Sequence, residues 1–217
     1  MKQFRRRTGT SRGFSIVELL VAVGIFLVLS ATFLFNYGSF DRRVTVDILA
    51  HQIAGWVRDA QVSAMSVKRA RNDDGKFPGY GLYFDMAAKN KFVFFADLNG
   101  DLKYTPYDPG TSKCGNALEE CEQEILLLHG NTIDSICGDE DSGSAGSCAS
   151  VNPGNPSLFT TDFAHVVFVR PNPFDATILG DPDTAPTRHS HVEVTIASPK
   201  GYRHTITIWI TGQVSVR

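Results

Sequence analysis

The sequence has 217 residues, of which 42% are hydrophobic and 20% are charged, so the chain is long enough for one folded domain with a substantial core. Residues 1–13 carry five of the 21 basic residues and no acid, which leaves 16 basic and 23 acidic residues, a charge of about −7, for residues 14–217. This acidic remainder argues against a general nucleic-acid-binding surface, because such surfaces are normally basic.

The first expected element is an apolar helix from Phe14 to Phe35. At about 1.5 Å per residue it is roughly 33 Å long, enough to span a bilayer. The basic residues before it predict that the N-terminus stays in the cytoplasm and that the remainder is exported. The run is longer than the apolar part of a secretory signal peptide, and no A-x-A-like cleavage motif closes it. A plain membrane anchor fits these features but leaves Glu18 unexplained, because charges within membrane segments are costly and are usually functional.

Gly13 and the residues after it, Phe14-Ser15-Ile16-Val17-Glu18-Leu19-Leu20, resemble the processing site of type IV prepilins and type II secretion pseudopilins. The resemblance implies that a prepilin peptidase/methyltransferase cleaves after Gly13, removes residues 1–13 as a leader, and N-methylates Phe14. It also implies a pilin fold, assembly with other pilin subunits into a helical filament, and an assembly platform in the inner membrane. Glu18 then has a role in assembly, because a carboxylate near the new amine of Phe14, in the same or a neighbouring subunit, would neutralise its charge in lipid.

Residues 14–35 are therefore expected to form the transmembrane or filament-core half of a long helix, and residues 36–71 its amphipathic half. Apolar residues recur with a 3.6-residue period in the second half, which indicates that one face packs against a globular head. They are Val46, Leu49, Ile53, Trp56 or Val57, Ala60, Ala64 and Val67.

Residues 72–217 are expected to form an exported, β-rich head. The fold class is α+β, with the long helix on an antiparallel sheet, because no helical periodicity separates the strand candidates. The Gly212-Gln213 step predicts a tight turn before the last strand. The layout also resembles the GspH/FimT group of minor pilins and pseudopilins. The expected strands are Tyr80–Met86, Lys91–Ala96, Glu124–His129, Phe163–Arg170, His191–Ala197, Tyr202–Ile210 and Gln213–Val216.

One acidic segment has the spacing of a calcium loop. Asp97, Asn99, Asp101 and Asp108 fall on ligand positions of a twelve-residue loop. Two features depart from that pattern: Leu102 stands where the loop needs glycine, and the last position is Asp rather than Glu. The favoured alternative is a hairpin turn, because Asn-Gly is a strong hairpin signal. No other cofactor is expected, and the binding of calcium by this segment is left open as the alternative to the hairpin turn.

The four cysteines, Cys114, Cys121, Cys137 and Cys148, all fall in the part expected to be exported, where disulfides persist. Three pairings are possible, and their spacings lack a C-x-x-C zinc pattern. Local pairs are favoured, Cys114 with Cys121 and Cys137 with Cys148, which would staple a loop of about residues 110–157. Long loops of this kind commonly carry recognition.

The sequence thus predicts a structural, pilin-like subunit of a type IV pilus or a type II secretion-type filament, first as a single-pass protein of the cytoplasmic membrane. No nucleophile elbow or phosphate-binding loop is present, so no enzymatic activity is expected. The alternative is a filament-tip binding module for DNA uptake or surface adhesion. In that case Arg188, Arg203 and Arg217 would form a local basic patch in an otherwise acidic head.

Overall fold

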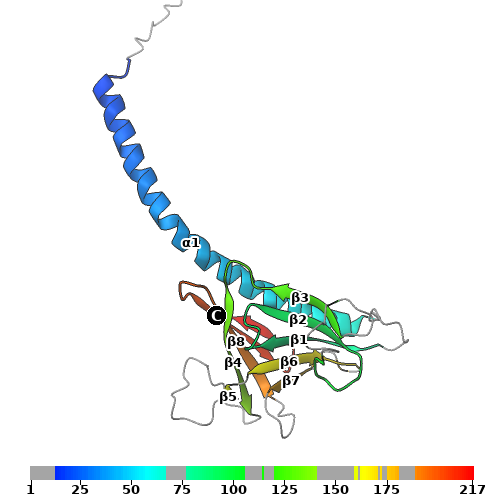
Figure 1. Ribbon diagram of the computed structural model, residues 1–217. Helices are drawn as coiled ribbons and strands as arrows, with labels where there is room; N and C mark the ends of the chain where they lie inside the picture. The colour runs from blue at the N-terminus through cyan, green and yellow to red at the C-terminus, as the bar shows by residue number, and fades with distance from the viewer. Residues whose placement is uncertain are drawn as a thin grey trace, which may run out of the picture. The chain divides into compact units, whose positions relative to one another are not determined.

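The structure is a computed structural model that describes residues 13–66, 77–105, 114, 120–140, 159–160, 162–170, 172, 175–180 and 189–217. Within these residues one helix, α1 (Ile16–Met65), is followed by strands that pair antiparallel, so the fold is α+β (Figure 1). The strands are β1 (Gly79–Asp85), β2 (Lys91–Asp97), β3 (Cys121–Leu126), β4 (Thr132–Glu140), β5 (Phe159–Thr160), β6 (Phe163–Phe168), β7 (Ala176–Gly180), β8 (His189–Ala197), β9 (Arg203–Trp209) and β10 (Val214–Val216).

The chain divides into two compact units, the first ending at Asp41 and the second beginning at Arg42. Helix α1 contributes to both. In the first unit, the segment Ile16–Leu34 is long and apolar enough to cross a membrane, and none of it is buried among the residues that the structure describes. The second unit contains the later part of α1 and all the described strands.

The strands of the second unit form two five-stranded sheets. The first sheet has the order β3-β2-β1-β6-β7, and the second has the order β10-β9-β8-β4-β5 (Figure 1). The backbone N–H of Ala176 on β7 donates to the carbonyl of Ile210, just after β9, at 2.5 Å, so the two sheets are joined at this point.

The main core lies between α1 and the inner faces of the sheets. The expected helical period is confirmed, because its apolar positions are buried or partly buried from Val46 to Ala64; Val67 lies outside the described residues. Alternate residues of the strands complete this core, for example Leu82 of β1 and Val194 of β8, as the two-residue period of a strand requires. The part of α1 that follows Arg42 is therefore held by apolar burial.

The outer face of the first sheet carries a second, smaller apolar cluster. Its buried members include Val93, Phe95 and Val167, which alternate with residues of the main core. Leu102 and Tyr104, from the connection between β2 and β3, pack over them. Both faces of this sheet are thus covered, which explains why β2 is apolar at nearly every position.

All seven expected strands are present, with ends that differ by up to three residues, and the closing turn is confirmed by Gly212, which has φ of 72° and donates to the carbonyl of Trp209 at 2.9 Å. Three strands were not expected: β4, β5 and β7. Strand β4 reads TIDSICGDE, in which Asp and Gly are poor strand formers, and it gains its place by pairing with β8.

Candidate functional site

The candidate processing and assembly residues, at and just before the start of α1, are exposed. Gly13 and Phe14 precede the helix, both exposed, and Glu18 lies in the first helical turn. A carboxylate there is favoured by the positive end of the helix dipole. A Cβ added to Gly13 would meet no atom within 4 Å, so the packing of this chain does not itself require glycine at that position. The basic leader before Gly13 lies outside the described residues.

The acidic segment forms a local turn, but the expected hairpin is wrong. Strand β2 ends at Asp97, and its partner β3 begins only at Cys121, so Asn99-Gly100 lies in a long connection and does not form a tight hairpin turn. The loop folds on its own side chains instead. Asp97 accepts hydrogen bonds from the backbone N–H of Gly100 at 2.7 Å and of Leu102 at 3.1 Å.

At Leu102 the loop adopts a backbone conformation that is usual for glycine. Leu102, which stands where a calcium loop needs glycine, has φ of 65°, in the left-handed region that side chains rarely adopt. Asn99 and Asp101 support this conformation, because their side chains accept from the N–H groups of Asp101 at 2.9 Å and of Lys103 at 2.8 Å. The departure from glycine therefore does not prevent the turn.

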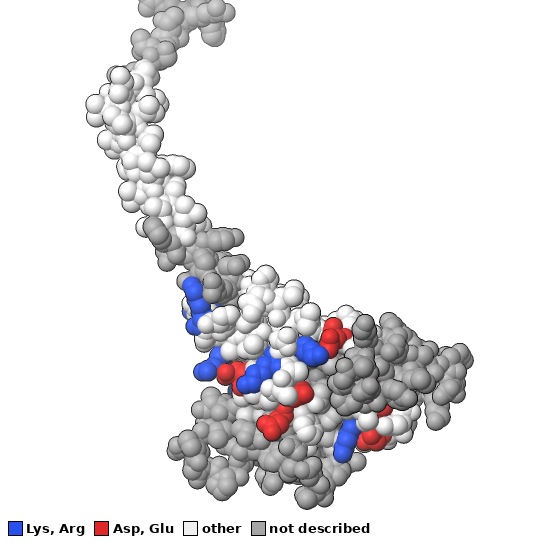
Figure 2. All heavy atoms as spheres, viewed as in Figure 1, with Lys and Arg blue, Asp and Glu red and all other residues white. Residues whose placement is uncertain are grey.

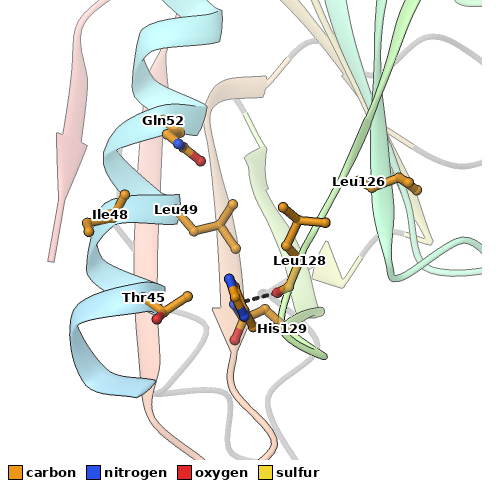
Figure 3. A pocket seen from close by; sticks show the side chains of 8 residues that line it. Thr45, Ile48, Leu49, Gln52, Leu126, Leu128 and His129 are labelled. Atoms are coloured by element: carbon orange, nitrogen blue, oxygen red, sulfur yellow. Dashed lines mark hydrogen bonds between the residues drawn. The ribbon is translucent and has the colours of Figure 1, made fainter. Parts of the chain in front are cut away.

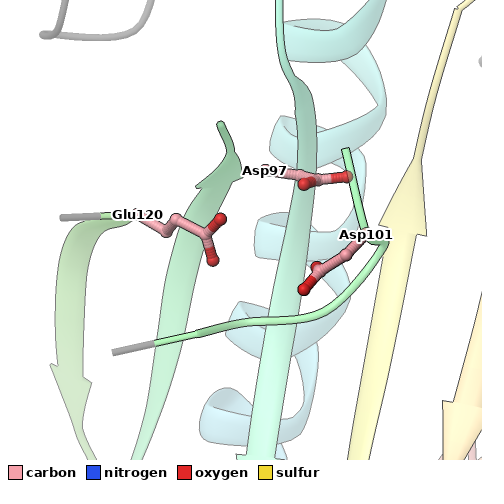
Figure 4. A group of neighbouring side chains, drawn as sticks. All are labelled: Asp97, Asp101 and Glu120. Carbon is pink, nitrogen blue, oxygen red and sulfur yellow. The ribbon is translucent and has the colours of Figure 1, made fainter. Parts of the chain in front are cut away.

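A third carboxylate, that of Glu120 just before β3, lies close to the carboxylates of Asp97 and Asp101 (Figure 4). One oxygen from each of the three side chains lies within 4.8 Å of the others, and Asp97 and Glu120 are only 4% and 5% exposed. Asp108, the expected last ligand, lies outside the described residues. Three carboxylates at this spacing could hold a hard cation such as Ca²⁺.

Burial disfavours the charged form of two of these carboxylates, Asp97 and Glu120. Burial raises the pKa of Glu120 to about 7, and the nearby charges of Asp97 and Asp101 add to the shift. The N–H of Thr105, which donates to Glu120 at 2.7 Å, opposes it. Burial also raises the pKa of Asp97, against the hydrogen bonds from Gly100 and Leu102. Glu120 is therefore partly protonated at neutral pH, which relieves the repulsion among the three groups.

His165 on β6 attaches the same loop to the first sheet. Its Nδ1 accepts from the N–H of Tyr104 at 3.0 Å, and its ring contacts Tyr83 with centroids 4.8 Å apart. The hydrogen bond requires Nδ1 to be unprotonated, so the neutral ring carries its proton on Nε2. Burial, followed by the charge of Lys103, lowers the pKa of His165 to about 4.

A disulfide joins Cys114 to Cys121, one of the two pairs expected from the sequence. Cys121 is buried in the outer cluster of the first sheet, and Cys114 packs against that cluster. This disulfide therefore attaches the connection between β2 and β3, at Cys114, to the outer face of the first sheet. Cys137 is also disulfide-bonded, while Cys148, its expected partner, lies outside the described residues.

The described arginines of the expected basic patch are both paired with acids. Arg203 Nε lies 2.9 Å from Asp134, and Arg217 Nη2 lies 3.5 Å from the buried Glu193. Arg188 lies outside the described residues. On the face drawn in Figure 2, the second unit shows basic and acidic side chains interspersed, whereas the described part of the first unit shows uncharged ones. The described part of this patch therefore offers little unpaired positive charge to a nucleic acid.

Comparison of the chain with family models, curated proteins and solved structures finds no match.

Proposed function

We propose that this protein is a pilin-like subunit, a minor pilin or pseudopilin, of a type IV pilus or a type II secretion-type filament. The observation that carries the proposal is the combination at the start of α1. The Gly13-Phe14 step comes just before an apolar segment, Ile16–Leu34, which contains Glu18 near its start and is not buried by any described residue. The later part of the same helix is built into the core of a β-rich head, as a pilin fold requires.

In this proposal the protein is inserted in the cytoplasmic membrane with its N-terminus in the cytoplasm and its head exported. The prepilin peptidase then cleaves after Gly13 and methylates Phe14. Extraction by the membrane assembly platform transfers Ile16–Leu34 from lipid into contact with the same segment of other subunits. Apolar side chains around the whole helix suit both surroundings.

In this proposal the negative charge of Glu18 attracts a neighbouring subunit and so favours the filament over the separate subunits in the membrane. The amine created at Phe14 is positively charged, and an opposite charge at about 4 Å is worth on the order of 4 kcal/mol at an effective dielectric constant of 20. Glu18 of an incoming subunit therefore pairs with the Phe14 amine of the subunit already in place. This pairing accounts for an acid in a segment that is otherwise free of charge.

Glu18→Ala tests this assignment. The variant should be inserted and cleaved as the parent is, because neither step uses the carboxylate, but its recovery in sheared filaments should fall roughly tenfold or more. Ser30→Ala, in the same apolar segment, is the matched control and should assemble normally. Incorporation of Glu18→Ala at the parental level would overturn the pairing.

A further inference from the structure

A groove in the second unit lies between α1 and the segment that follows β3 (Figure 3). Its volume is about 230 Å³. A cavity of roughly 150 Å³ accommodates a benzene ring, so the groove has room for a large apolar side chain. Its lining residues are Thr45, Ile48, Leu49, Gln52, Leu126, Leu128, His129 and Asn131.

The groove presents apolar side chains that the head does not cover. Ile48 is 51% exposed, Leu126 54% and Leu128 64%, whereas Leu127 between the two leucines is buried. These three exposed aliphatic side chains all line one hollow, and exposed apolar residues that gather in this way are a feature of interaction surfaces.

The turn that carries Leu128 is held in place. Buried Asn131 donates from its side chain to the carbonyl of Leu128 at 2.8 Å. His129 and Gly130 follow Leu128 with φ of 61° and 74°, which reverses the chain within two residues. Because the backbone is fixed in this way, Leu128 is presented in a set position, which lowers the entropy lost on binding.

The lining contains no Asp, Glu, Lys or Arg, and beside its four aliphatic residues it has Thr45, Gln52, His129 and Asn131, so it suits an uncharged occupant with large aliphatic side chains. The chain itself contains such a segment: Ile16–Leu34 is uncovered and has Glu18 as its single charged residue. The segment cannot fill the groove of its own copy, because Thr45–Gln52 belong to the same helix α1. The face of the head drawn in Figure 2 instead carries basic and acidic side chains interspersed.

We propose that the groove binds the apolar helix of a second copy of this chain. This inference rests on the proposed function and adds to it a specific contact between head and helix. The proposed function assigns Phe14 and Glu18 to a contact with each other across subunits, so we assign to the groove the later half of the apolar helix, Phe26 to Leu34. An amphipathic or apolar helix in a groove is a recurrent recognition mode, with side chains of one helical face as anchors.

Cysteine cross-linking in cells tests the contact with the full chain. Leu128→Cys is co-expressed in turn with single cysteine variants at each position from Phe26 to Leu34, and filaments or membranes are oxidised before analysis. The described native cysteines are in disulfides and should not compete. The expected result is a cross-linked dimer at positions about three to four residues apart, which mark one face of a helix.

Each other result overturns the inference. Absence of a dimer, or equal yields at every position, would mean that no helix occupies the groove. Efficient Leu128→Cys homodimers would mean that a second head occupies it. N-terminal processing, measured on the same samples, separates the two proposals. Processed chains in filaments without the cross-link leave the proposed function standing, whereas unprocessed chains remove the proposed function as well.

A substitution pair gives an independent readout. Leu128→Gln should leave the melting temperature of the head unchanged, because the side chain is mostly exposed, and should lower incorporation into filaments roughly tenfold. Val62→Gln replaces another exposed aliphatic residue, at 53%, away from the groove and should assemble normally. Equal incorporation of the two variants would contradict a role for the groove.

Discussion

The guanidinium group of Arg170 donates to the carbonyl of Ala64: Nε of Arg170, beyond the end of β6, lies 2.9 Å from that oxygen. Its Nη2 lies 2.6 Å from the carbonyl oxygen of Met65, the last residue of α1. The last turn of α1 has no basic residue of its own. The residue two positions after β6 therefore donates to the C-terminal carbonyl groups of α1, which have no partner within the helix itself.

Arg170→Ala should lower the free energy of unfolding of the head by about 1–3 kcal/mol, because two carbonyl oxygens at the helix terminus lose a charged donor. Arg170→Lys keeps the charge but not the paired donors and should recover part of the loss. Urea unfolding of the full-length chain in detergent, followed by circular dichroism, measures both. Parental stability of Arg170→Ala would contradict a capping role.

The second prediction concerns acid sensitivity at His165. Its pKa is lowered from 6.5 to about 4 in the folded head, so the unfolded chain binds the proton more readily between these values. The contribution of His165 to stability is therefore complete above pH 6.5 and is lost as the pH falls toward 4. His165→Asn keeps an acceptor for the N–H of Tyr104 but does not titrate. The difference in melting temperature between parent and variant should change across this window and be constant above it.

Glu120 should produce the opposite dependence. Its pKa is raised from 4.5 to about 7, so the folded head binds this proton more tightly, and stability falls as the pH rises from 4.5 through 7. Glu120→Gln keeps an acceptor for Thr105 and removes the charge. In EDTA at pH 8 it should be more stable than the parent by on the order of 1–3 kcal/mol, with no gain at pH 4. A variant that loses stability at pH 8 would contradict repulsion among Asp97, Asp101 and Glu120.

Removal of the disulfide between Cys114 and Cys121 should destabilise the cover of the first sheet. The bridge closes a loop with a sequence separation of seven residues. For a loop of this size the entropic model gives about 2 kcal/mol. The double variant Cys114→Ser, Cys121→Ser should lower the unfolding free energy by this amount. It should also increase hydrogen exchange at the N–H of Tyr104, which is bonded to His165, more than at β9, which lies in the other sheet.

The sequence predicted elements whose signals are local. The burial of Val46, Ile53 and Ala64 follows from a helical period, and the turn at Gly212 from a glycine between two apolar strands. The sequence did not predict contacts between residues that are far apart in the chain. Glu120 joins Asp97 because β3 pairs with β2, and Arg170 reaches α1 because β6 ends beside it.

Strands β4 and β7 were missed for a related reason. Strand β4 owes its place to β8, and β7 is a short strand at the edge of the first sheet beside β6. A strand stabilised by its neighbours carries a weak signal of its own, because strand propensity mostly reports packing against cross-strand residues. The Asn-Gly pair predicted a turn within Asp97–Asp101, but the sequence did not show that this turn begins a long connection between β2 and β3.

The most direct measurement is the intact mass and N-terminal sequence of the protein recovered from membranes or sheared filaments. A pilin-like subunit should begin with N-methylated Phe14 and lack residues 1–13. A chain that still carries residues 1–13, in cells with an active prepilin peptidase, would show that Gly13 is not a processing site and would contradict the assignment of this protein to a filament.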